Sequence, residues 1–232
     1  MAVFHRSMWA TTKSAPDGSF DASAGVEDWL HGFAVTIRGH DDVAAQVTAT
    51  STRHPWTTCP GALASVTTLA GPVASLPVKA TELPTDATCV HLNDLVWLAS
   101  RRHPERRYDI EVTRQNAELT RDGVVLLRWR LADWRIDGTG RFRGLGFPGA
   151  GWAAALDDVG ADDDLREAVR VMRRAIMVAM GYFELDWRRI RVGTDVPTEV
   201  MAETCHTFTA SRVASATCLV EPPERRSGSA RR

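Results

Sequence analysis

The chain has 232 residues, of which 44% are hydrophobic, and it carries 28 basic and 29 acidic residues. This apolar content can fill the core of one large domain or of two joined small ones. The balanced charge provides no field that would draw the chain to nucleic acid or to an anionic membrane. The N-terminus lacks the apolar run of a signal peptide, and no stretch approaches the ~18 uncharged residues of a membrane span.

We therefore expect a globular cytoplasmic protein without nucleic-acid or membrane partners. In that compartment its cysteines should be free thiols, and their wide spacing does not suggest a disulfide framework. These are Cys59, Cys89, Cys205 and Cys218.

Alternating apolar residues predict a first β block over residues 5–58. Segments 9–15 and 19–26 flank Pro16-Asp17-Gly18, a combination that favours a tight turn. Residues 33–38 alternate in polarity, and residues 43–50 supply a β-branched return strand. The pattern indicates an antiparallel meander.

A second β block is predicted over residues 107–137, with a turn at Asp122-Gly123. DGSFDASAGVEDW, which starts at Asp17, aligns without a gap with DGVVLLRWRLADW, which starts at Asp122. If the match is real, two similar half-sheets could pack about a pseudo-twofold axis. A chance match is the alternative, because Asp-Gly is common in hairpin turns.

Helices are predicted over residues 60–70, 88–101 and 162–181. Pro60 suits the first turn of the first helix, and Gly71-Pro72 ends it. The following stretch contains Pro77 and Pro84, which favour a loop.

The third helix has clear limits, because Asp162 can cap it and Gly181 is placed for its C-terminal turn. Its polar face carries several arginines, which form either a solvated face or a binding surface for an acidic partner or anionic ligand. They are Arg166, Arg170, Arg173 and Arg174.

Together these elements predict an α+β fold, with antiparallel sheets built from two hairpin or meander blocks and packed with about three helices. We expect a single domain over residues 1–215. The segment 216–232 has few apolar residues and is predicted to be a disordered tail.

The stretch ATCVHLNDLVWLAS places Cys89 and His91 at the start of the second helix, near opposite borders of its apolar stripe. A thiol in a first helical turn feels the helix dipole, which lowers its pKa and favours the thiolate. Cys89 is therefore a candidate reactive group. The alternative is that Cys89 is a small buried hydrophobe and His91 a hydrogen-bonded border residue.

Three short motifs resemble the uncharacterised bacterial family called domain of unknown function 2889. They are Asp28-x-x-His31, Pro55 followed by Cys59-Pro60, and Cys89-x-His91-Leu92-x-Asp94-Leu95. The similarity runs from about His5 to Ala214, and Val90 stands where the family usually has threonine. The resemblance implies a shared fold and a shared site that groups Asp28, His31, Cys59, Cys89, His91 and Asp94.

Histidines partnered by carboxylates can move protons to and from a bound substrate. The candidate catalytic residues are Asp28 with His31, His91 with Asp94, and Cys89. Asp28 and His31 can meet only if the chain turns or bulges near Gly32, since residues three apart on a strand lie on opposite faces.

These groups predict a cofactor-independent lyase or isomerase that acts on a hydrophobic small molecule. The eight tryptophans make an aromatic or terpenoid-like substrate reasonable. The candidate substrate-binding residues are Trp29, Cys59 and Trp97.

Three alternatives stay open. Zinc could be bound by Cys59, Cys89, His91 and Cys205, although no C-x-x-C pair is present. Cys89 could act as a nucleophile with a histidine base. The same apolar cavity could bind a small ligand without chemistry, and exposed strand edges could form a homodimer.

GLGFPG, from Gly144 to Gly149, matches the pattern of dinucleotide-binding loops. No parallel βαβ unit is evident, and Pro148 removes an amide that such a loop would present to phosphate. A mobile loop over a pocket or a plain connection is the better prediction.

Overall fold

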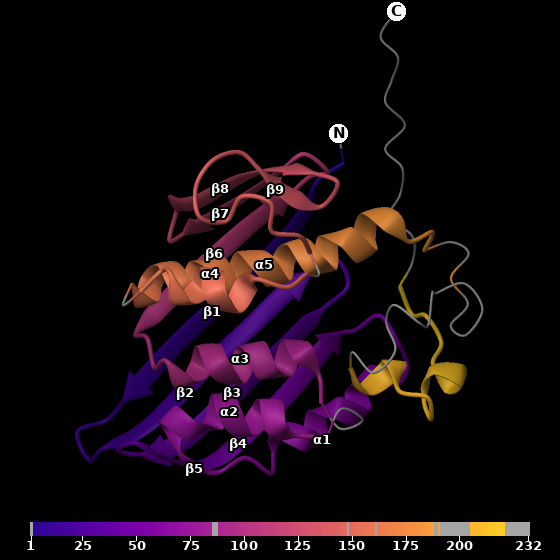
Figure 1. The fold of residues 1–232 in the computed structure, drawn as a ribbon. Coiled ribbons are helices and arrows are strands. Elements are labelled where there is room, and N and C mark those ends of the chain that lie inside the picture. The colour runs from indigo at the N-terminus through magenta and orange to yellow at the C-terminus, as the bar shows by residue number, and fades with distance from the viewer. Residues whose placement is uncertain are drawn as a thin grey trace, which may run out of the picture.

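The computed structural model describes residues 2–84, 88–147, 149–160, 162–187, 190 and 205–220. Nine antiparallel strands form one open sheet in the order β5-β4-β3-β2-β1-β6-β7-β8-β9 (Figure 1). Their bounds are Phe4–Ser14 (β1), Ser19–Asp28 (β2), Gly32–His40 (β3), Val43–Arg53 (β4), Gly71–Pro72 (β5), Glu105–Val112 (β6), Asn116–Arg121 (β7), Val124–Ala132 (β8) and Arg135–Asp137 (β9).

The α-helices all cover one face of this sheet (Figure 1). They are α1 (Leu63–Val66), α2 (Leu76–Glu82), α3 (Val90–Ser100), α4 (Trp152–Asp157) and α5 (Asp163–Glu184). Helix α3 packs on β1, β2 and β3, whereas α5 packs on β1, β6, β7 and β8. The two helices thus meet over the central strand β1. The α+β class is confirmed.

The core lies between the sheet and the helices. Strand β1 alternates strictly, so that Met8 and Ala10 are buried under the helices while Ser7 and Trp9 lie on the open face. On β2 the small side chains of Ala22 and Ala24 face the helices. They leave room for the apolar stripe of α3, which contains the fully buried Leu92 and Leu95.

The expected two-block arrangement differs from the observed sheet. Both blocks belong to one continuous sheet, joined by the pairing of β1 with β6. A twofold axis between these strands would relate β2 to β7, whereas the sequence match equates β2 with β8. The turns also differ, because Asp122 and Gly123 both have positive φ (51° and 82°), as a type I′ turn requires, whereas at the other turn only Gly18 does (87°). The match therefore does not correspond to a symmetry of the fold.

The helix count was also too low. Helix α2 occupies residues expected to form a loop, because Pro77 lies in its first turn, where a missing backbone N–H costs nothing. Helix α4 was missed because it is short and has little periodicity. Helix α5 begins as predicted, with Asp162 accepting a hydrogen bond from the backbone N–H of Leu165, but it continues past Gly181 to Glu184.

Part of the predicted tail is ordered. Residues 216–220 run beside residues 55–57, where the Leu219 N–H donates to the Pro55 carbonyl (2.8 Å) and the Thr57 N–H donates to the Thr217 carbonyl (3.0 Å). Residues 221–232 of the predicted tail lie outside the described residues. Among the helices described, none is long and apolar enough to cross a membrane.

One glycine on the open face is required by close packing. A Cβ atom at Gly25 would lie 2.4 Å from the Trp9 ring on the neighbouring strand. We expect Gly25→Ala to lower the free energy of unfolding by about 1–3 kcal/mol through overpacking, as measured by urea denaturation. In a Trp9→Ala background the same change should cost much less; an equal cost in both backgrounds would contradict this explanation.

Candidate functional site

The turn between β2 and β3 brings Asp28 and His31 together. Asp28 ends β2, and its backbone N–H donates to the His31 carbonyl (2.8 Å), which leaves a two-residue loop between them. The Asp28 carboxylate accepts hydrogen bonds from the backbone N–H groups of Leu30 (2.7 Å) and His31 (2.8 Å). The chain therefore reverses at residues 29–30, just before Gly32, near which a turn or bulge was expected.

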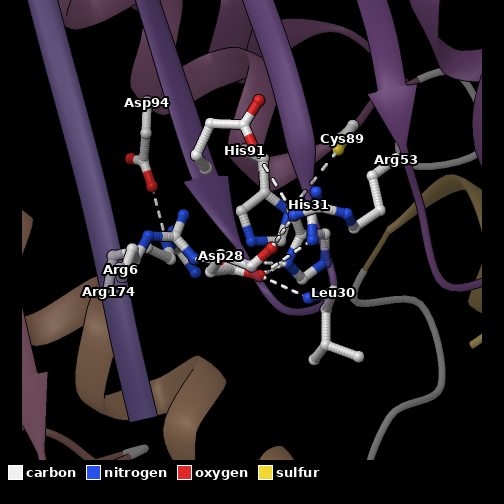
Figure 2. Close-up of polar contacts among 10 residues, drawn as sticks. Arg6, Asp28, Leu30, His31, Arg53, Cys89, His91, Asp94 and Arg174 are labelled. Carbon is white, nitrogen blue, oxygen red and sulfur yellow. Dashed lines mark hydrogen bonds and ion pairs between the residues drawn. The ribbon is translucent and has the colours of Figure 1, made fainter. Parts of the chain in front are cut away.

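Arg6 and Asp28 form a buried ion pair on the helix-covered side of the sheet. Arg6 Nη1 lies 2.6 Å from Asp28 Oδ2, and neither side chain is more than 1% exposed (Figure 2). Burial alone would raise the pKa of Asp28, but the neighbouring His31 and Arg6 and the hydrogen bonds outweigh burial, so the pKa lies below its usual value. Asp28 is therefore an ionised carboxylate.

An ionised Asp28 fixes the tautomer of His31. His31 Nδ1 lies 3.1 Å and 3.3 Å from the two carboxylate oxygens. Because a carboxylate only accepts hydrogen bonds, Nδ1 must carry the proton. The hydrogen bonds that His31 makes within the described part of the chain use Nδ1 or its backbone, and Nε2 takes part in none of them.

His91, from the first turn of α3, lies against His31. The two rings lie side by side (Figure 2), with centroids 4.0 Å apart and an interplanar angle of 35°. Phe33 stacks on the His91 ring with a centroid distance of 6.1 Å. The Nε2 atom of His91 is buried and has no hydrogen-bond partner among the residues that the structure describes. Burial, followed by the positive charge of His31, holds the pKa of His91 well below 6.5. Near neutral pH His91 is therefore an uncharged imidazole.

Cys89 joins this group but is not activated. Its Sγ lies 3.9 Å from His91 Nδ1. Burial raises the pKa of the Cys89 thiol to about 12, which reverses the direction expected from the helix dipole. Cys89 is the N-cap residue of α3, with extended backbone, and desolvation outweighs the dipole there. The proposal of a thiolate nucleophile is corrected accordingly.

We expect iodoacetamide to label Cys89 slowly in the folded protein at pH 7.5, because the neutral thiol is a poor nucleophile. Labelling should become at least tenfold faster in urea, where burial is lost. Peptide mass spectrometry at several time points would measure both rates. Rapid labelling of folded protein, comparable to that in urea, would restore Cys89 as a reactive thiol.

Asp94 does not partner His91. The carboxylate of Asp94 instead accepts from Arg174 Nε (2.5 Å) and lies 3.4 Å from Arg170 Nη2, and both arginines belong to α5. Three positions along a helix place His91 and Asp94 on neighbouring faces, but the guanidinium groups of α5 provide stronger partners for the carboxylate. The second predicted His–Asp pair is therefore wrong.

Of the candidate substrate-binding residues, Trp29 lies in a groove and the other two lie elsewhere. A groove of about 330 Å³ is lined by Trp29, the aromatic rings of Phe4 and Tyr182, Val3, and the polar residues His5, Ser7, Glu27, Asp28 and Arg53. His31, His91 and Cys89 do not line it. Trp97 lies under the guanidinium of Arg170, with 4.5 Å between Cζ and the ring centroid.

Cys59 lies beside the C-terminal segment. Its Sγ is 3.4 Å from Thr207 Oγ1, and the backbone N–H of His206 donates to the Thr88 carbonyl (2.8 Å). These contacts bring Cys59, Cys89 and Cys205 into one region. Burial raises the pKa of Cys59 to about 11. Among the residues described, no three or more His, Cys, Asp or Glu side chains are arranged to hold a metal ion.

Sequence reasoning missed Arg6 and His54. Arg6 stands between Phe4 and Met8 on the buried face of an alternating strand, and a charged residue at such a position is a signal that could have been used. His54 lies near His31, and its pKa is lowered by burial and then by the charge of His31. Nothing in the sequence distinguishes His54 from other loop histidines.

The glycine-rich motif forms a connection. The backbone N–H of Ile136 donates to the Leu145 carbonyl, and the Gly144 N–H donates to the Ile136 carbonyl, so this loop folds back on β9. Pro148 lies outside the described residues. The antiparallel setting agrees with the rejection of a dinucleotide site.

The sequence matches no family model and no curated protein. The geometry of the Arg6–Asp28–His31–His91 cluster is therefore the main indication of function.

Proposed function

We propose that the protein is a cofactor-independent lyase or isomerase that uses His31 and His91 as an acid–base pair on a hydrophobic small molecule. The observation that carries this proposal is the 4.0 Å separation of two imidazoles whose surroundings differ. His31 is hydrogen-bonded to an ionised carboxylate, whereas His91 lies in an apolar setting beside Phe33.

Different surroundings suit the two imidazoles to opposite tasks. Asp28 orients the His31 ring through Nδ1, and a protonated His31 held in this way can donate a proton from Nε2. The low pKa of His91 keeps that ring neutral and able to accept a proton. An acid and a base on adjacent rings are what an elimination or a proton shift requires, since one group removes a proton while the other delivers one.

The substrate class is inferred from the apolar surroundings. Phe33 stacks on His91, and the aromatic groove beside Asp28 is formed in part by Trp29. Such surfaces suit an aromatic or terpenoid-like molecule. The proposed route for proton transfer is Nε2 of His31 to the substrate and the substrate to His91.

A non-catalytic ligand-binding protein is the second candidate. It is favoured by one observation, that the groove of about 330 Å³ is lined by Trp29 and Tyr182 but not by either imidazole of the pair. In that case an apolar ligand would occupy the groove without contact with His31 or His91. Membership of the domain of unknown function 2889 family, and a homodimer, are retained as proposals.

The decisive experiment is a screen of aromatic and terpenoid metabolites incubated with the purified protein in D2O. An acid–base enzyme should incorporate deuterium from solvent into its substrate or product, which mass spectrometry reads as a gain in mass. A binding protein would shift thermal stability with a ligand and leave the mass of that ligand unchanged.

A further inference from the structure

The arginines of α5 carry more positive charge than their neighbours neutralise. Arg170 and Arg174 lie one helical turn apart and share a single carboxylate, that of Asp94 on α3. Arg173 has no ion-pair partner in the described part of the chain, and its Cζ lies 5.3 Å from the centroid of the Trp152 ring. Three guanidinium groups on one stretch of helix therefore share one counter-charge.

The imbalance continues into the core beneath the helices. Arg6 is buried and paired with Asp28, and after burial and the charge of Asp28, the positive charge of Arg174 also acts on Arg6 and lowers its pKa. Among the described residues, these four guanidinium groups therefore have two carboxylates as ion-pair partners, those of Asp28 and Asp94. The Nε atoms of Arg6 and Arg173 are both buried, and neither has a hydrogen-bond partner within the part of the chain that the structure describes. Excess positive charge in a half-buried region is costly, and a bound anion would offset it.

Arg170 and Arg174 line a crevice between α3 and α5. Its apolar lining comes from Met8, Trp97, Leu98 and Val171, and its polar lining comes from Asp94, Arg170 and Arg174. The cavity measures about 10 Å³, enough for a single water molecule, so a ligand group would bind at its mouth. The arginine side chains are 38% (Arg170) and 21% (Arg174) exposed, which leaves their remaining N–H groups accessible from solvent.

We propose that the mouth of this crevice binds an oxyanion, the carboxylate or phosphate of a small molecule, through Arg170 and Arg174. A guanidinium group matches both kinds of oxyanion with paired N–H donors. Arg174 uses Nε to hold Asp94, and its two terminal nitrogens form no hydrogen bond with the residues that the structure describes, so they can serve as donors to an anion. This binding site goes beyond the proposed acid–base function and does not depend on it.

Thermal unfolding in two anions tests the proposal. Sodium phosphate or sodium benzoate is added to 50 mM at pH 7.5, with sodium chloride adjusted to keep the ionic strength constant. For a dissociation constant near 1 mM, Tm should rise by about 3–6 °C. A rise with phosphate alone indicates a phosphate group, and a rise with benzoate alone indicates the carboxylate of an apolar acid. No rise with either anion overturns the proposal.

Variants separate the site from general salt effects. Arg170→Gln and Arg174→Gln should each remove most of the rise, whereas Arg166→Gln should retain it. Arg166 lies on the same helix but pairs with Asp157, so it controls for net charge and for nonspecific stabilisation by phosphate. Equal loss in Arg166→Gln would overturn the proposal. If Arg174→Gln does not fold, the more exposed Arg170→Gln carries the test. No activity is measured, so failure of the enzymatic proposal would leave this result unchanged.

Discussion

Replacing Arg6 with methionine is expected to lower the free energy of unfolding at pH 7 by about 3–5 kcal/mol. Arg6 is 2% exposed, and its removal leaves the ionised carboxylate of Asp28 buried without the guanidinium that lies 2.6 Å from it. Methionine fills a similar volume, so the cost arises from charge and not from a cavity. Urea denaturation of the wild type and the variant at pH 7 measures the difference.

An exposed ion pair on the same sheet provides the matched control. Arg38 Nε lies 3.2 Å from Asp21 Oδ1, with side chains 59% and 52% exposed, so Arg38→Met should change stability by no more than about 1 kcal/mol. A cost for Arg6→Met as small as that of Arg38→Met would contradict the buried pair as a source of stability.

The pH dependence of the stability difference between wild type and Arg6→Met tests whether the Asp28 carboxylate causes that difference. In the wild type the folded pKa of Asp28 is below its unfolded value, so its contribution is present above about pH 4 and is lost as pH falls through the folded pKa. In Arg6→Met burial should raise the pKa of Asp28. Asp28 then becomes protonated at mildly acidic pH, and the variant no longer carries an unpaired buried charge. The difference in stability between the two proteins should therefore shrink from pH 7 to pH 4.

The strands were predictable because the sequence features that indicate them, alternating apolar residues and turn residues, are local. Alternation on β1 and β2 identifies the buried face without any knowledge of neighbouring strands, and Asp-Gly marks the turns. The joining of both blocks into one sheet was not predictable, since the pairing of β1 with β6 joins residues about 100 positions apart. Helix α2 was missed because Pro77 was taken as a helix breaker, although it fits a first turn.

The sequence predicted which residues lie together at the site, but it did not predict all of their pairings. Asp28, His31, Cys89 and His91 do lie together, yet Asp94 turns to Arg174 because the opposing face of α5 supplies charge that the α3 sequence does not reveal. The state of Cys89 was predicted wrongly for a similar reason. The helix dipole can be read from sequence, whereas burial by other segments, which dominates the thiol pKa, cannot.

His31→Gln and His91→Gln are each expected to lower turnover by about 10²–10⁴-fold, because each removes one partner of the acid–base pair. Glutamine retains hydrogen-bonding capacity but cannot exchange protons near neutral pH. The measurement is the rate of deuterium incorporation into whichever compound the wild type labels in D2O. His40→Gln serves as the control, since the His40 side chain is 62% exposed at the far end of β3 and should leave the rate unchanged.

Stability measurements decide whether a loss of turnover reflects chemistry or folding. The folded pKa of His91 lies well below 6.5, so below pH 6.5 the unfolded chain binds a proton that the folded chain does not. The free energy of unfolding therefore decreases as the pH is lowered below 6.5, by up to about 1.4 kcal/mol per pH unit. His91→Gln should remove this component while Tm at pH 7.5 stays near the wild-type value. Loss of turnover accompanied by an equal loss of folding at pH 7.5 would reassign both histidines to structure, because an acid–base role requires a folded site that has lost only its protons.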